Sequence, residues 1–154
     1  MLDRYMERAV QLALDNVKEG GGPFGAVLVK DGEIVAEGVN ELHKHHDISG
    51  HAELLAIRRA QQKFNTLDLS GFTMYASGEP CPMCLTAIYF SNITDVYYCQ
   101  SIDDAEKAGL GRSKEIYENL KKERGEREIV MKHMPLTVDM ENPFQKWVDY
   151  DEHG

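Results

Sequence analysis

The spacing of apolar residues changes near residue 20, and the change separates a predicted helix from a predicted hairpin. Between Asp3 and Lys18, apolar residues recur at steps of three and four, which predicts an amphipathic helix that the glycine-rich residues 20–23 end. Residues 24–30 form a short and mostly apolar run, which predicts a buried strand. Asp31-Gly32 then predicts a tight turn, followed by a returning strand over 34–38.

Helices and strands are predicted to alternate along the rest of the chain. We expect a polar loop over 40–50, helices over 51–63, 81–91, 103–120 (interrupted at 109–111) and 143–150, and strands over 72–76, 95–99 and 128–134. Strands that alternate with helices after an opening hairpin imply a mixed sheet covered on both faces. The predicted fold class is therefore α/β, a three-layer α/β/α sandwich whose mixed sheet has about five strands.

The length of the chain predicts one domain. A chain of 154 residues can bury one continuous core, and the sequence contains no repeat and no linker long enough to divide it. We therefore expect residues 1–154 to form a single domain, with 140–154 as its C-terminal tail.

Charge and composition narrow the range of partners. The formal charge is −9, from 26 acidic and 17 basic residues, whereas nucleic-acid binders normally carry a cationic face. A small-molecule substrate is therefore favoured over a nucleic acid. The apolar runs are too short to cross a bilayer, so no membrane association is expected. Polar and amphipathic sequence follows Met1, without the basic segment and apolar run of a secretory signal, and we therefore expect a cytoplasmic protein.

Two short segments carry the candidate chemistry, His51-Ala52-Glu53 and Pro80-Cys81-Pro82-Met83-Cys84. Cys81 and Cys84 are three residues apart on a predicted helix, so their sulfurs lie on one face and can hold one metal ion. The start of a helix also favours thiolates, because its free N–H groups point toward them. With His51 as a third ligand, one zinc ion per chain would keep a fourth position open to water, as catalytic zinc sites do.

Glu53 is the candidate catalytic residue. It follows His51 by two positions, so one side chain can face the metal while the other reaches the water. A carboxylate placed there can take the water's proton, pass it to a ring nitrogen and later protonate the departing amine. His-x-Glu followed by Pro-Cys-x-x-Cys is the signature of zinc-dependent nucleobase deaminases.

Each segment alone permits another interpretation. His-x-Glu triplets arise by chance, and a Cys-x-x-Cys pair can be a redox pair or half of a structural zinc site. Cys99 could supply the fourth ligand of such a site, which would make the chain a non-catalytic zinc-binding module. That alternative leaves Glu53 without a role, and cysteines on strands are usually core residues.

At these motifs the sequence resembles the cytidine deaminase-like superfamily, and within it the bacterial guanine deaminases, over most of its length. The similar segments are Gly22–Val27, Glu79–Cys84 with Ala87–Tyr89, and Asn142–Trp147. The resemblance implies hydrolysis of guanine to xanthine and ammonia. It also implies a homodimer in which the tail, residues 140–154, covers the active site of the partner.

The resemblance further implies where the base is bound. Phe24 is expected to form a wall of the pocket, and Asn40 is expected to hydrogen-bond the purine ring. Ala52, Phe90 and Arg112 are the remaining expected substrate contacts.

Two positions depart from the guanine deaminase pattern. Arg112 stands in a segment where many members have Gly-Phe-Asp-Asp-Ser, and an arginine can only donate hydrogen bonds. Phe90 replaces an expected tryptophan. The alternative activities are therefore deamination of adenosine in transfer RNA and deamination of cytosine or of a nucleoside. The net negative charge of the chain disfavours transfer RNA as the substrate.

Overall fold

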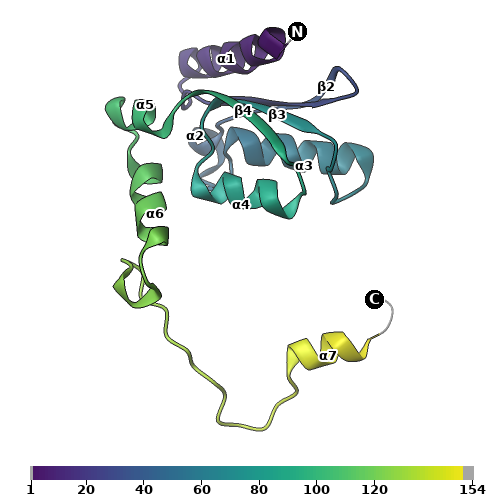
Figure 1. The fold of residues 1–154 in the computed structure, drawn as a ribbon, viewed down its shortest axis with the longest axis vertical. Coiled ribbons are helices and arrows are strands. Elements are labelled where there is room, and N and C mark those ends of the chain that lie inside the picture. The colour runs from purple at the N-terminus through teal and green to yellow at the C-terminus, as the bar shows by residue number, and fades with distance from the viewer. Residues whose placement is uncertain (1, 151–154) are drawn as a thin grey trace. The chain divides into compact units, whose positions relative to one another are not determined.

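The computed structural model describes the backbone of residues 2–150 and the side chains of residues 4–150 (Figure 1). The helices are α1 (Leu2–Lys18), α2 (Leu42–His45), α3 (Ala52–Phe64), α4 (Pro82–Phe90), α5 (Ile102–Lys107), α6 (Arg112–Lys121), the 3-10 helix η1 (Arg124–Glu126) and α7 (Pro143–Asp149). The strands are β1 (Gly25–Lys30), β2 (Glu33–Val39), β3 (Thr73–Gly78) and β4 (Asp95–Gln100). The chain divides into two compact units, Met1–Lys121 and Lys122–Gly154.

The first unit contains a mixed sheet. Its strand order is β2-β1-β3-β4, with β1 antiparallel to both of its neighbours and β3 parallel to β4. The parallel pair is joined through α4, as the alternation of helices and strands predicted. The predicted α/β class with a mixed sheet is confirmed, but the sheet of the described residues has four strands instead of about five.

The missing strand is the one predicted over residues 128–134. In the structure this segment is irregular, and no described strand pairs with it. Its apolar side chains Ile129, Val130, Met131 and Met134 are between 62% and 91% exposed. An apolar run becomes a strand only where a neighbouring strand accepts and donates its hydrogen bonds, and no described strand does so here.

The turn between β1 and β2 has the conformation that its sequence requires. Asp31 and Gly32 have φ angles of 51° and 80°. Two positive φ angles in a two-residue turn match the right-handed twist of the strands it joins, and Asp-Gly tolerates them. The predicted hairpin is therefore confirmed.

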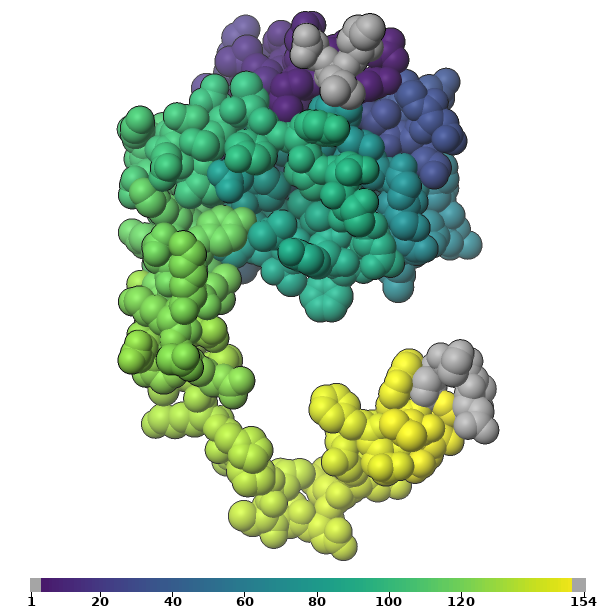
Figure 2. All heavy atoms as spheres, viewed as in Figure 1, coloured from purple at the N-terminus to yellow at the C-terminus, as the bar shows by residue number. Residues whose placement is uncertain are grey.

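The sheet is covered on both faces, which gives the three predicted layers. Ala26 and Leu28 of β1 belong to the core cluster shared with α3 and α4, and Val27 and Val29 belong to the cluster formed with α1. Figure 1 shows α1 on one side of the sheet and α3 and α4 on the other, and Figure 2 shows the atoms of α1, in purple, lying directly against the rest of the first unit. β1 is thus the central, doubly buried strand.

Two glycines allow the helices to lie close to the sheet. A Cβ built on Gly25 would overlap the carbonyl oxygen of Ala9 in α1, and one built on Gly38 would overlap that of Ala52 in α3. Both neighbours are backbone atoms, which cannot turn aside as a flexible side chain can. The position of α3 against β2 therefore depends on the absence of a side chain at residue 38.

The second unit contains η1 and α7 among its described residues. Asn142 caps α7 by accepting hydrogen bonds from the backbone N–H groups of Phe144 and Gln145, at 2.8 and 3.2 Å. The helix predicted over 143–150 is confirmed, and residues 151–154 of the predicted tail lie outside the described residues. No described helix of the chain is long and apolar enough to span a bilayer.

Candidate active site

Three candidate metal ligands meet where α3 and α4 begin. His51 precedes the first residue of α3, and its side chain makes no capping hydrogen bond, so the imidazole is available to turn toward α4. Cys81 is the N-cap residue of α4, where its sulfur accepts a hydrogen bond from the N–H of Cys84 at 3.5 Å. Pro82 occupies the first turn, where a missing N–H leaves no bond unmade.

The three side chains have a separation that suits zinc. The Nδ1 atom of His51 lies 3.4 Å from Sγ of Cys81 and 3.6 Å from Sγ of Cys84. A tetrahedral zinc ion, about 2.3 Å from sulfur and about 2.0 Å from nitrogen, holds such atoms about 3.6 Å apart. Among the described residues these three form the only group of this kind, with all ligand atoms within 4.8 Å of one another. His51, Cys81 and Cys84 therefore fit a zinc ion.

The two cysteines are electrostatically unequal. A hydrogen bond from the Cys84 thiol lowers the pKa of Cys81 to about 4, with a further contribution from His51. The same hydrogen bond, together with burial, raises the pKa of Cys84. The hydrogen bond to Cys81 also raises the pKa of His51. Because zinc binds thiolates, its binding would release the proton that Cys84 retains.

Glu53 is buried beside these ligands. It lies in the first turn of α3 and is only 5% exposed. Burial is the main cause that raises its pKa to about 7, and the nearby charge of Cys81 adds to the effect. A carboxylate with a pKa near the working pH can both accept and return a proton, which is the property required of a general acid–base.

A cavity of about 250 Å³ opens at this site. His51, Glu53 and Cys81 line it, so the metal ligands and the candidate acid–base face a common space. Its remaining walls come from the segment before β1, from the start of α2 and the residues before it, from the first residue of α3, from the residue after β3 and from the α5–α6 region: Phe24, Asn40, Leu42, Ala52, Glu79, Ile102, Ala105, Leu110, Arg112 and Ser113.

Four of the five expected substrate contacts line this cavity: Phe24, Asn40, Ala52 and Arg112. Asn40 is 7% exposed, and its Oδ1 accepts a hydrogen bond from the N–H of Leu42 at 3.1 Å. Phe24 is held against Gly78, where a Cβ would approach its ring to 3.0 Å.

Phe90 does not line the cavity. It is the last residue of α4 and is 82% exposed. Since α4 begins at the metal site and rises about 1.5 Å per residue, its last residue lies more than two turns away. The expectation that Phe90 contacts the substrate finds no support in the described structure.

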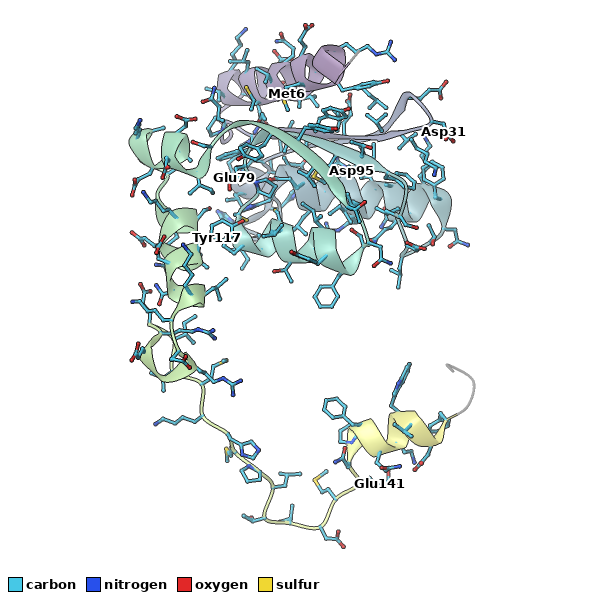
Figure 3. The ribbon with its side chains drawn as sticks, in the orientation of Figure 1. Met6, Asp31, Glu79, Asp95, Tyr117 and Glu141 are labelled. Atoms are coloured by element: carbon cyan, nitrogen blue, oxygen red, sulfur yellow. The ribbon has the colours of Figure 1, made fainter. Side chains whose placement is uncertain are left out.

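Contacts that the sequence did not indicate hold the wall formed by α5 and α6. Oε1 of Glu79 accepts a hydrogen bond from the N–H of Ile102, at 2.9 Å, and thus binds the first residue of α5. The phenol of Tyr117 in α6 donates to the carbonyl of Pro80 at 2.6 Å, and burial is the main cause that raises the pKa of this phenol to about 12. In Figure 3, Glu79 and Tyr117 lie near each other, and the charge of Glu79 contributes to the raised pKa of Tyr117.

Known proteins similar to this chain are deaminases, and the matching family model describes a zinc-binding region, in agreement with the zinc-ligand set described above. The model of the cytidine and deoxycytidylate deaminase zinc-binding region matches residues 1–100. Guanine deaminase of Bacillus subtilis (strain 168) is 42% identical over 149 residues, which cover 96% of this chain and 94% of that protein. An X-ray structure of guanine deaminase from Bacillus subtilis matches with a TM-score of 0.90 and 41% identity, covering 97% of this chain and 95% of that one.

Two further relatives are less similar. A structure of guanine deaminase from Nitrosomonas europaea has a TM-score of 0.65 and 31% identity, covering 68% of this chain and 62% of that one. The tRNA-specific adenosine deaminase of Aquifex aeolicus (strain VF5) is 36% identical over 94 residues, which cover 61% of this chain and 62% of that protein.

The chain therefore belongs to the cytidine and deoxycytidylate deaminase family. It is a zinc-binding, hydrolytic deaminase that acts on C–N bonds. Within the family it is a homologue of the Bacillus subtilis guanine deaminase over nearly the whole length of both chains. The predicted family, zinc cofactor and enzyme class are confirmed.

Proposed function

We propose that the chain hydrolyses guanine to xanthine and ammonia. The observation that carries the proposal is the cavity of about 250 Å³ in which buried Glu53 faces the zinc-ligand set. Cavities for drug-sized ligands begin at about 300 Å³, so this space suits a free base better than a polynucleotide. The full-length similarity to a guanine deaminase supports guanine as that base.

Metal binding and proton transfer are carried out by different residues of the chain. His51, Cys81 and Cys84 would hold zinc, which polarises water and lowers its pKa toward about 7. Glu53 takes the proton from the attacking water and delivers it to a nitrogen of the ring. It then takes the proton of the newly added hydroxyl group and passes it to the departing amine, so that the carbonyl forms as the C–N bond breaks and ammonia leaves as a neutral molecule.

Phe24 and Asn40 orient the base. The Phe24 ring offers a flat apolar face on which a purine can stack. The amide oxygen of Asn40 is already engaged by the N–H of Leu42, so its NH₂ group is the part that can donate to a carbonyl or ring nitrogen of the base.

Arg112 does not exclude guanine from the cavity. Its Nη1 donates to Oε2 of Glu115 at 2.9 Å, and both side chains are more than 60% exposed. At least one donor of the guanidinium is therefore engaged by Glu115 rather than directed toward the N–H groups of guanine.

The proposal is tested by ammonia release from the zinc-loaded protein with guanine, adenine, cytosine, their nucleosides and transfer RNA. Guanine should be the preferred substrate. Glu53→Gln should retain zinc and lose activity by a factor of about 10² to 10⁴, because the amide can neither accept nor return the proton. Glu33→Gln, an exposed change of the same kind, is the matched control and should remain fully active.

Two results would contradict different parts of the proposal. If the protein released ammonia from another base and none from guanine, the deaminase mechanism would stand and guanine would be refuted as the substrate. Full activity in Glu53→Gln with guanine would refute the role of Glu53.

We also propose that the chain works as a homodimer in which the tail, residues 140–154, covers the partner's cavity. Support comes from the apolar residues of the second unit that its own fold leaves uncovered. Phe144 is 84% exposed, Trp147 60% and Val148 65%, and these residues share one side of α7. Apolar surface of this kind usually marks an interface.

Mixing two impaired variants tests this arrangement. Glu53→Gln lacks the acid–base, and Phe144→Ala/Trp147→Ala lacks the two exposed aromatic groups on one side of α7. If the tail acts on the partner, a mixed dimer contains one intact Glu53 covered by one intact tail, and the mixture should recover part of the activity. A mixture no more active than its components, or a monomer in sedimentation, would refute the proposal.

A further inference from the structure

Asn16 is a buried amide that touches neither the metal ligands nor the cavity. It lies in the last turn of α1 and is 2% exposed. Its Nδ2 donates two hydrogen bonds, one to the carbonyl of Gly22 and one to the carbonyl of Asn40, both at 2.8 Å. One side chain therefore joins α1 to both segments that supply the expected base contacts.

These two bonds complete the attachment of Asn40. The backbone N–H of Asn40 donates to the carbonyl of Phe24 at 3.2 Å, and its carbonyl accepts from Asn16. Its side-chain oxygen accepts from Leu42. With both backbone groups and the oxygen engaged, the direction of the NH₂ group of Asn40 is fixed.

The carbonyl of Gly22 connects Asn16 to Phe24 as well. It accepts from Nδ2 of Asn16 and from the N–H of Phe24, which lies 2.9 Å away. Asn16 thus restrains the loop on which Phe24 is carried.

Glycines make room for this arrangement. A Cβ at Gly21 would overlap the amide of Asn16 and lie 2.5 Å from Cε1 of His43. A Cβ at Gly22 would lie 3.1 Å from the amide of Asn40. The loop can approach both asparagines only because residues 21 and 22 have no side chains.

Stability alone does not account for an asparagine at this position. The Oδ1 atom of Asn16 is buried without a hydrogen-bond partner among the described residues. A buried polar atom without a partner is destabilising, so part of what the two donated bonds contribute is lost. The amide instead fixes the positions of Asn40 and of the Phe24 loop, on the side of the cavity where the base is proposed to bind.

We propose that Asn16 is a positioning residue for substrate recognition, which sets the direction of the Asn40 amide from behind the cavity. The proposal rests on the proposed function, since it takes Asn40 to contact the base.

The test compares Asn16→Leu with Tyr5→Phe. Leucine has a similar size and no donor, so it removes both hydrogen bonds. Tyr5 is a matched control in the same helix, because its buried phenol also donates to a glycine carbonyl, that of Gly32, at 2.6 Å and away from the cavity. Loss of a well-placed hydrogen bond corresponds to about a five- to tenfold change in binding.

Asn16→Leu should raise KM for guanine by about five- to tenfold, with kcat and zinc content nearly unchanged. Tyr5→Phe should leave KM unchanged. In an Asn40→Ala background, Asn16→Leu should raise KM much less, because the amide it positions is gone and only the restraint on the Phe24 loop is lost. An equal rise in KM in both backgrounds would overturn the proposal, since a general loss of structure acts regardless of Asn40.

A second measurement does not depend on activity. The NMR signals of the Asn40 side-chain amide, identified by their disappearance in Asn40→Ala, should shift or broaden in Asn16→Leu and not in Tyr5→Phe. If the wild-type protein does not deaminate guanine, the proposed function fails. The comparison of the Asn40 NMR signals then decides the role of Asn16 by itself. Unchanged Asn40 signals would overturn it. If Asn16→Leu does not fold, Asn16→Ser, whose single hydroxyl donor cannot serve both carbonyls, replaces it in both measurements.

Discussion

Replacing Gly38 by alanine tests how closely the catalytic helix depends on the sheet. Gly38 lies in β2 directly beneath the first turn of α3. A Cβ at this position would overlap the carbonyl oxygen of Ala52 and would lie 2.9 Å from the backbone nitrogen of Ala56. Both are backbone atoms of α3, so the added methyl group can be accommodated only if the helix moves away from β2.

The size of the effect follows from these distances. Ordinary contact begins at 3.4 Å, so α3 must retreat by about 0.5 Å at Ala56 and by more at Ala52. Overpacking of this kind costs about 1–3 kcal/mol of unfolding free energy. For a chain of this length, each kcal/mol corresponds to about 2–4 °C in Tm, so Tm should fall by about 2–12 °C.

The displacement of α3 also changes the positions of two site residues relative to the other metal ligands. His51 and Glu53 flank Ala52, so they move with the helix, whereas Cys81 and Cys84 belong to α4. The retreat needed at Ala52 is larger than that at Ala56, and a misplacement of 1 Å can reduce rates by about 10², so kcat should fall by roughly tenfold to a hundredfold. We therefore expect Gly38→Ala to lose both stability and activity.

The assay is thermal unfolding and guanine turnover of zinc-loaded Gly38→Ala beside Gly125→Ala. A Cβ at Gly125 meets no atom within 4 Å, so this control should match the wild type in both measurements. If Gly38→Ala kept the wild-type Tm and kcat, the close approach of α3 to β2 would not constrain the site, and the reasoning would be refuted.

Three further changes are expected to act on separate parts of the site. Cys84→Ser should lose zinc and stability together, because metal binding is coupled to folding, and full zinc content in the purified variant would contradict the ligand assignment. Tyr117→Phe removes the hydrogen bond to the carbonyl of Pro80, which precedes a ligand, and should weaken zinc about fivefold in competition with a chelating dye. Equal affinity of Tyr117→Phe and wild type would show that the bond does not hold the metal loop. Arg112→Asp should raise kcat/KM for guanine relative to adenine, because aspartate can accept hydrogen bonds from the N–H groups of guanine, and an unchanged ratio would remove Arg112 from recognition.

Several elements could be predicted because their causes are local. The helix ended by the glycines of 20–22 and the Asp31-Gly32 hairpin depend on residues within a few positions of one another, and both are present in the structure. The polar loop over 40–50 was predicted without the short helix α2, which is too brief to have a clear apolar period. The strand over 128–134 was predicted wrongly, because pairing depends on a partner backbone that an apolar pattern cannot specify.

The sequence by itself determined the metal chemistry of this protein. Cys81 and Cys84 share one turn at the start of a helix, and Glu53 follows His51 by two residues, so the spacing within each segment already fixes what the side chains can do together. The sequence did not determine the environment of Glu53. Its burial, which raises its pKa to about 7, results from packing around α3.

Only the tertiary structure decided how the cavity is enclosed. The bond from Asn16 to Asn40 spans 24 residues, and the bond from Tyr117 to Pro80 spans 37. No periodicity in the sequence relates such positions, because their distance is set by the strand order and by the depth at which each helix packs. The position of Phe90 outside the lining of this cavity has the same cause, since Phe90 ends the helix whose other end carries the metal ligands.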